Sequence, residues 1–105
     1  MNNDANIAVL LPCHNEEATI GKVIDDFRAQ LPAARIYVFD NCSDDASEKI
    51  AREHGAEVIS EPRQGKGYVV ESMFSGIDAD ICVMADADDT YPAENVHELI
   101  EPVRL

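Results

Sequence analysis

Apolar and polar positions follow each other in blocks along the 105-residue chain, and these blocks predict alternating strands and helices. Short, largely apolar runs at residues 7–11, 36–39, 57–60 and 80–85 have the length and the β-branched content of buried strands. Apolar residues at three- and four-residue spacing predict helices in residues 20–31, 69–77 and 92–100. N-capping side chains at residues 43–45 and a glycine at position 55 predict a further helix between them. Four such units predict one α/β domain over residues 1–105, with a parallel, Rossmann-like sheet covered by helices on both faces.

Polar residues gather immediately after three of the predicted strands. Residues 12–17, 40–45 and 86–90 are polar and mostly acidic. Because ligands bind α/β sheets beyond the carboxyl ends of the strands, we expect these segments to line one cleft. The first two segments have a structural explanation as well, since they can begin the first helix and cap the second.

Three carboxylates follow the fourth predicted strand within four residues: Asp86, Asp88 and Asp89. Crowded carboxylates repel each other, so a strand that delivers them together indicates a bound cation. A small hard cation takes one or two carboxylates together with the phosphate oxygens of a substrate. The pattern therefore predicts a metal–diphosphate site at the end of this strand.

The composition narrows the class of partners. Eight basic and twenty-one acidic side chains give a formal charge of −13, which opposes binding to nucleic acid or to an anionic membrane surface. The three cysteines are an odd number without zinc-ligand spacing, so we expect buried, reduced thiols in a cytoplasmic chain. No segment reaches the roughly eighteen apolar residues of a membrane span. Met73, Phe74 and Met84 fit positions in the core.

Four segments form a set that points to one known family. They are Leu-Pro-Cys-His-Asn-Glu-Glu at 11–17, Val-Phe-Asp-Asn-Cys-Ser-Asp-Asp at 38–45, Arg-Gln-Gly-Lys-Gly at 63–67 and Asp-Ala-Asp at 86–88. In this order and spacing they resemble the N-terminal half of a family 2 glycosyltransferase with the GT-A fold, the last being its DxD motif. The chain departs from the family where Asn41 and Cys42 replace the commoner Asp-Gly.

The resemblance implies a nucleotide-sugar site and a sheet order of 3-2-1-4. Asp40 would accept a hydrogen bond from the nucleotide base, and Asp86 and Asp88 would hold the ribose and a Mg²⁺ or Mn²⁺ that bridges the donor diphosphate. No catalytic residue is assigned. The residues that the resemblance places in the nucleotide-sugar site are Pro12, His14, Glu16, Asp40, Lys66, Asp86, Ala87 and Asp88.

The resemblance also implies the reaction and its partners. The parent protein would transfer a sugar from a UDP- or GDP-linked donor, and the sequence at 86–92 looks most like enzymes that use polyprenyl or dolichyl phosphate as acceptor. The acceptor-binding half has no counterpart here, so we expect a fragment that does not turn over by itself. We expect it to self-associate through the open edge of the fourth strand, and the full-length protein to work at the inner membrane face.

Two alternatives remain at this point. Residues 86–90 also satisfy the DxDxT pattern of haloacid dehalogenase-type phosphatases, in which the first aspartate is a nucleophile. That fold, however, carries the motif on its first strand. The second alternative is a nucleotide-binding module without catalysis.

Overall fold

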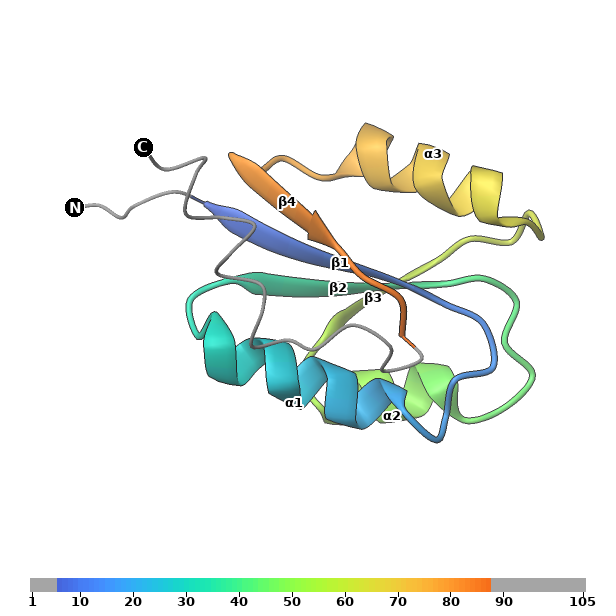
Figure 1. Ribbon diagram of the computed structural model, residues 1–105. Helices are drawn as coiled ribbons and strands as arrows, with labels where there is room; N and C mark the ends of the chain where they lie inside the picture. Colours follow the sequence, from blue (N-terminus) through green and yellow to red (C-terminus); the bar gives the residue numbers. More distant parts are fainter. Residues whose placement is uncertain (1–5, 88–105) are drawn as a thin grey trace.

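The computed structural model describes residues 6–87, which form a four-stranded parallel sheet with helices on both faces (Figure 1). Along the chain the elements are β1 (Ile7–Cys13), α1 (Ile20–Gln30), β2 (Arg35–Asp40), α2 (Ser47–Glu53), β3 (Glu57–Ser60), α3 (Lys66–Gly76) and β4 (Ile81–Met84). The strand order β3-β2-β1-β4 confirms the predicted α/β class and topology. The helix predicted at 92–100 lies outside the described residues.

The register of the strands brings their carboxyl ends to one edge of the sheet. Cys13, the last residue of β1, pairs with Asp40 of β2, which pairs in turn with Ser60 of β3. β4 runs parallel to the first half of β1, so residues 85–87 continue toward the same edge. The segments after β1, β2 and β4 therefore meet there, as predicted.

Alternate side chains of the strands fill two cores on opposite faces of the sheet, because successive residues of a strand point in opposite directions. Figure 1 shows α1 and α2 below the sheet and α3 above it. The core under α1 and α2 includes Val9, Leu11, Ile20, Val23, Ile24, Phe27, Ile36, Val38 and Val83. The smaller core under α3 consists of Ala8, Leu10, Tyr37, Phe39, Val69 and Met73. Since α3 contributes only the last two as buried side chains, apolar packing alone fixes its position weakly.

β1 continues two residues beyond the strand end predicted at residue 11. Pro12 pairs with Phe39 of β2, although proline has no N–H group to donate. The Leu10 carbonyl accepts a hydrogen bond from the Ala85 N–H group at 3.3 Å, so even-numbered residues of β1 direct their backbone groups toward β4. Pairing with β4 ends at Leu10, and the missing N–H group of Pro12 costs no ladder hydrogen bond.

The acidic residues of the first polar segment precede the first helix and form a separate turn. α1 starts at Ile20, so Glu16 and Glu17 lie in the turn before it. The Glu16 carbonyl accepts hydrogen bonds from the N–H groups of Thr19 and Ile20. The Thr19 hydroxyl donates to the Ala87 carbonyl at 2.6 Å, which ties the start of α1 to the segment after β4.

Several apolar side chains are more exposed than the sequence pattern predicts. Phe74 on α3 is 73% exposed and Met84 on β4 is 50% exposed, so the core position predicted for each is wrong. Cys13 is buried as expected, whereas Cys42 is half-buried and Cys82 is exposed. Met84 is exposed because α3 packs over β1 and β2 and leaves the same face of β4 uncovered by the described residues.

None of the helices within residues 6–87 has the length and apolar character that crossing a membrane requires.

Candidate nucleotide-sugar site

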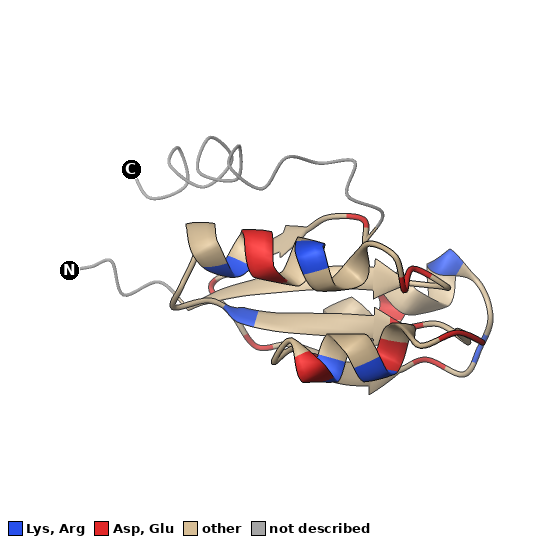
Figure 2. Cartoon of the chain, turned by 90° about the horizontal axis from the view of Figure 1, so that it is seen from below, with Lys and Arg blue, Asp and Glu red and all other residues tan. Residues whose placement is uncertain are grey.

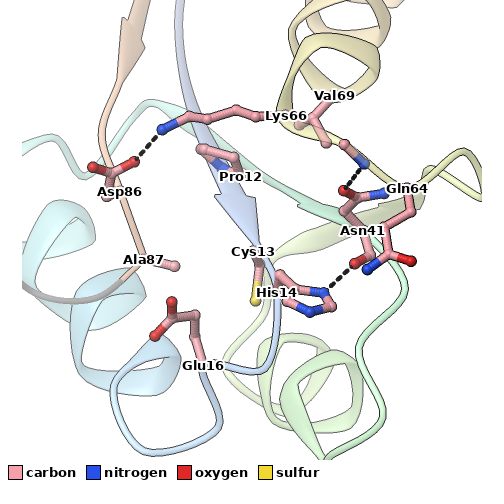
Figure 3. Close-up of a pocket in the computed structure, with 11 residues that line it drawn as sticks. Pro12, Cys13, His14, Glu16, Asn41, Gln64, Lys66, Val69, Asp86 and Ala87 are labelled. Atoms are coloured by element: carbon pink, nitrogen blue, oxygen red, sulfur yellow. Dashed lines mark hydrogen bonds and ion pairs between the residues drawn. The ribbon is translucent and has the colours of Figure 1, made fainter.

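A cavity of about 430 Å³ opens at the carboxyl ends of the strands (Figure 3). Its walls come from the end of β1, the end of β2, the β3–α3 loop and the segment after β4. The lining residues are Pro12, Cys13, His14, Glu16, Asn41, Gln64, Gly65, Lys66, Val69, Asp86 and Ala87. In Figure 2, acidic segments recur in the loops at this end of the sheet.

Hydrogen bonds join the β1–α1 loop to the β2–α2 loop and fix one wall of the cavity. Asn15 adopts a left-handed backbone conformation with φ of 54°, which asparagine tolerates better than most residues. Its N–H group donates to the Ser43 hydroxyl at 2.9 Å, and its Oδ1 accepts from the Asp44 N–H group at 2.7 Å. The Glu16 N–H group donates to the buried Ser47 hydroxyl at 2.8 Å.

Asp45 completes this connection just before α2. Its Oδ1 accepts from the N–H group of Ser47 at 2.9 Å and from the hydroxyl at 2.5 Å, and its Oδ2 accepts from the Glu17 N–H group at 3.2 Å. The hydrogen bond from the Ser47 hydroxyl lowers the pKa of the Asp45 carboxyl. The structural explanation of this acidic segment therefore applies to Asp45, which accepts from the first N–H group of α2 and binds the neighbouring loop, although the N-cap position itself is Ala46.

Asp40 lies at the end of β2 and is 6% exposed. Its Oδ1 is buried and has no hydrogen-bond partner in the described part of the chain. A buried acceptor without a partner costs about 1–3 kcal/mol, so this oxygen is suited to a donor from outside residues 6–87. Asp40 does not line the cavity, although its neighbours Cys13 and Asn41 do.

Cys13 and His14 present different chemistry to the cavity. Burial raises the pKa of the Cys13 thiol to about 11, so the thiol stays protonated at neutral pH and is no nucleophile there. His14 Nδ1 lies 2.5 Å from the Asn41 carbonyl, which can only accept, so this nitrogen carries the proton. Nε2 of the neutral ring is therefore an acceptor.

An ion pair crosses the mouth of the cavity. The Lys66 ammonium at the start of α3 lies 3.3 Å from Asp86 Oδ1, and Figure 3 shows the lysine side chain reaching across from the helix to the segment after β4. Both side chains are more than half exposed, so the pair contributes little to stability. Lys66 is the one lysine or arginine among the described residues that line the cavity.

A second ion pair shapes the loop that carries Lys66. Glu61, at 3% exposure, accepts from the Arg63 N–H group at 2.7 Å and from its guanidinium, and from the Ser72 hydroxyl at 2.5 Å. The Arg63 guanidinium and this hydroxyl lower the pKa of the Glu61 carboxyl to about 2. Arg63 also stacks on the Tyr68 ring at 4.6 Å, so the β3–α3 loop is folded onto the first turns of α3.

The structure brings together most of the residues that the sequence assigned to the site. Six of them line the cavity: Pro12, His14, Glu16, Lys66, Asp86 and Ala87. Asp40 is adjacent but lies on the face of β2 that α1 and α2 cover, and Asp88 lies outside the described residues. Cys13, Asn41, Gln64, Gly65 and Val69 line the cavity without having been predicted. All but Val69 lie in the motifs at 11–17, 38–45 and 63–67, which were the available signal.

The donor atoms near Asp86 suit a hard cation. The Asp86 carboxylate is exposed at the cavity mouth, and Figure 3 shows the Glu16 carboxylate pointing toward neighbouring Ala87. Residues 6–87 contain no group of three histidine, cysteine or carboxylate side chains that could hold a metal by themselves. A metal at Asp86 would thus need further oxygen ligands, such as phosphate groups or side chains beyond residue 87.

Comparison with known proteins places this site in a family. The sequence pattern described as "Glycosyl transferase family 2" matches residues 8–104. The chain is 52% identical over 100 residues to Protein RfbJ of Shigella flexneri, covering 95% of this chain and 78% of RfbJ. It is 35% identical over 96 residues to a dolichyl-phosphate hexose transferase of Haloferax volcanii, covering 91% of this chain and 42% of that protein.

A solved structure agrees with the sequence relatives. The crystal structure of glucosyl-3-phosphoglycerate synthase from Mycobacterium tuberculosis, in complex with Mn²⁺, UDP and glucosyl-3-phosphoglycerate, superposes with a TM-score of 0.84 at 31% identity. The match covers 96% of this chain and 40% of that one. The sheet order 3-2-1-4 and the four motifs are thus those of a GT-A nucleotide-binding region, and the chain belongs to glycosyl transferase family 2.

Proposed function

We propose that this chain is the donor-binding domain of a hexosyltransferase and binds a nucleoside-diphosphate sugar through Mg²⁺ or Mn²⁺. The observation that carries the proposal is the cavity at the strand ends, which is lined by the Asp86 carboxylate and the Lys66 ammonium group. Beside it lies the buried Asp40 Oδ1, an acceptor without a partner among the described residues. A diphosphate needs positive charge, and a nucleobase needs a specific hydrogen-bond acceptor. The position of the DxDxT segment after the fourth strand, and not on the first, argues against the phosphatase alternative.

In this proposal each residue has a role that its surroundings permit. Pro12, His14 and Glu16 line the nucleoside pocket. We keep Asp40 Oδ1 as the acceptor for the base, a role that requires the residues covering this buried oxygen to move when nucleotide binds. His14 Nε2, which lies 3.4 Å from the Asn15 side-chain amide, exchanges this long contact for a ribose hydroxyl. Lys66 leaves Asp86 for the diphosphate, because an exposed ion pair is easily exchanged for a phosphate contact.

The metal would be held by Asp86 and Asp88. Bound between these carboxylates and the diphosphate, it would neutralise charge on the departing nucleoside diphosphate. Solved structures of the mycobacterial synthase contain Mn²⁺ or Mg²⁺ with UDP, which supports this choice of ion. The same relative supports a UDP-linked donor, although GDP stays open as the nucleotide.

We further propose a lipid phosphate of the polyprenyl type as the acceptor, supported by the similarity to the dolichyl-phosphate hexose transferase. The chain spans about two-fifths of that relative and of the mycobacterial synthase. We expect the 105-residue chain to bind donor without transferring the sugar, because donor binding neither positions an acceptor nor activates its nucleophile. We also expect self-association through β4, whose exposed Met84 lies at an edge of the sheet.

The decisive experiment is a calorimetric titration of UDP and GDP with and without Mn²⁺. We expect one nucleotide to bind with Mn²⁺ and to lose binding in EDTA, and Asp88→Ala to weaken binding at least about tenfold. Asp26→Ala, which removes a carboxylate from an exposed pair on α1, serves as the matched control. Nucleotide binding that persists undiminished in EDTA, or equal affinity of wild type and Asp88→Ala in the presence of Mn²⁺, would reject the metal bridge.

A second assay separates binding from turnover. The purified chain is incubated with nucleotide sugars and lipid-phosphate acceptors. The rate at which nucleoside diphosphate is released is compared with the rate of its release by hydrolysis without acceptor. We expect no excess release. Turnover would show that the catalytic apparatus lies within this chain.

A further inference from the structure

The side chain of Asn41 occupies a junction between β2 and the β3–α3 loop. It is 7% exposed, and both of its polar atoms are used. Nδ2 donates to the Glu61 carbonyl at 2.9 Å and to the Arg63 carbonyl at 3.0 Å, while Oδ1 accepts from the Gly65 N–H group at 3.0 Å. The amide therefore holds the loop at three points, and this pattern fixes which side-chain atom is nitrogen and which is oxygen.

The third of these contacts reaches the start of α3. Gly65 has φ of 137°, a conformation that side chains rarely adopt, and its carbonyl accepts from the N–H groups of Tyr68 and Val69 in the first turn of the helix. Lys66 follows Gly65 directly and begins α3. Because α3 has only two buried side chains, polar contacts help to place it: Asn41 holds the residue before Lys66, and the Glu61–Ser72 hydrogen bond holds the helix further along.

We propose that Asn41 is a positioning residue of the nucleotide site, required as an amide because it must donate to two carbonyl groups and accept from one N–H group at once. The effect of Asn41 on nucleotide binding rests on the proposed function, whereas its effect on the β3–α3 loop does not. An aspartate has the same shape and keeps the acceptor for Gly65. Its second oxygen would face the Glu61 and Arg63 carbonyls, where a carboxylate repels and only a protonated carboxyl can donate.

The test compares Asn41→Asp with Gln30→Glu, which makes the same change from amide to carboxylate at the end of α1. Gln30 is not among the residues that line the cavity. At pH 7.5 we expect Asn41→Asp to bind UDP with Mn²⁺ at least about tenfold more weakly than wild type, which corresponds to the loss of two neutral hydrogen bonds. Gln30→Glu should change the affinity less than about threefold.

The pH dependence distinguishes positioning from general damage to the fold. The carboxyl that Asn41→Asp introduces faces two carbonyl groups, so its pKa should lie above the usual aspartate value. Lowering the pH from about 7.5 to 5.5 should therefore protonate it, restore a donor and return the affinity toward wild type. The other titratable or charged groups around this position are His14, Cys42, Lys66 and the side chains of Glu61 and Arg63. Affinities are therefore taken as the ratio to wild type at each pH, and a ratio that stays constant would overturn the proposal.

Amide hydrogen exchange tests the loop without nucleotide. In Asn41→Asp at pH 7.5, repulsion at the Glu61 and Arg63 carbonyls should push the loop, and with it Gly65, away from the retained acceptor. The Gly65 N–H group should therefore be protected in wild type and exchange at least about tenfold faster in the variant, while Val38 in the centre of β2 keeps its protection. Unchanged exchange at Gly65 would overturn the proposal. If Asn41→Asp does not fold, Asn41→Ser replaces it, with fast Gly65 exchange and no recovery at low pH expected. Failure of the wild type to bind either UDP or GDP with Mn²⁺ would reject the proposed function and leave the exchange result to decide the role of Asn41.

Discussion

Lys66→Ala removes the ammonium group at the cavity mouth and separates its structural from its ligand-binding contribution. The ammonium lies 3.3 Å from Asp86, and the two side chains are 72% and 53% exposed. Such a pair contributes about 0.2–1 kcal/mol, so the free energy of unfolding should change little. A charge-assisted hydrogen bond to a phosphate contributes about 1.5–3 kcal/mol. After subtraction of the ion pair that must be broken, the net loss is about 1–2 kcal/mol, or roughly tenfold in affinity.

The assay is a titration of UDP with Mn²⁺ at low and high salt, with urea unfolding of each variant. Lys22→Ala is the control, because Lys22 on α1 also forms an exposed ion pair, with Asp26 at 2.6 Å. The tenfold difference should shrink as salt rises from about 0.05 to 0.5 M, since both charges are exposed to solvent. Affinity of Lys66→Ala within about twofold of wild type at low salt would refute the assignment of this residue to the diphosphate.

Three further predictions concern the framework of the site. Gly21→Ala should lower the free energy of unfolding in urea by about 1 kcal/mol, because the new Cβ would lie 2.7 Å from His54 Nε2. This overpacking outweighs the gain in helix propensity, and a more stable variant would contradict it. Cys42 has φ of 61°, so Cys42→Gly should stay within about 1 kcal/mol of wild type, whereas Cys42→Val should be clearly less stable in the same assay. Hydrogen bonds from Arg63 and Ser72 lower the pKa of Glu61 from 4.5 to about 2. The ionised Glu61 carboxylate therefore stabilises the fold fully above pH 4.5, and this stabilisation is lost as the pH falls toward 2. Wild type should therefore lose more stability than Glu61→Gln over that interval, and parallel acid profiles would exclude the ion pair as the cause.

The sequence alone determined the order of the elements and the edge at which the site forms. Apolar runs that end in Pro12, Asp40 and Asp86 are local signals, and parallel strands must end at one edge, so the convergence of these segments follows from the chain order. The resemblance of the motif at 63–67 to the Gly-Lys-Gly loop of the family likewise placed Lys66 in the site, and Lys66 lines the cavity.

Tertiary structure decided what each of these residues contacts. The pattern of apolar residues on α3 did not reveal which strands the helix covers, so Phe74 and Met84 were expected in the core and are exposed. The buried oxygen of Asp40, unpaired within residues 6–87, and the three loop contacts of Asn41 depend on residues some twenty positions away in the chain. Hydrogen-bond partners at such separation are set by strand register and loop packing, which the local sequence does not encode, and this is why the amide of Asn41 became meaningful only in the folded chain.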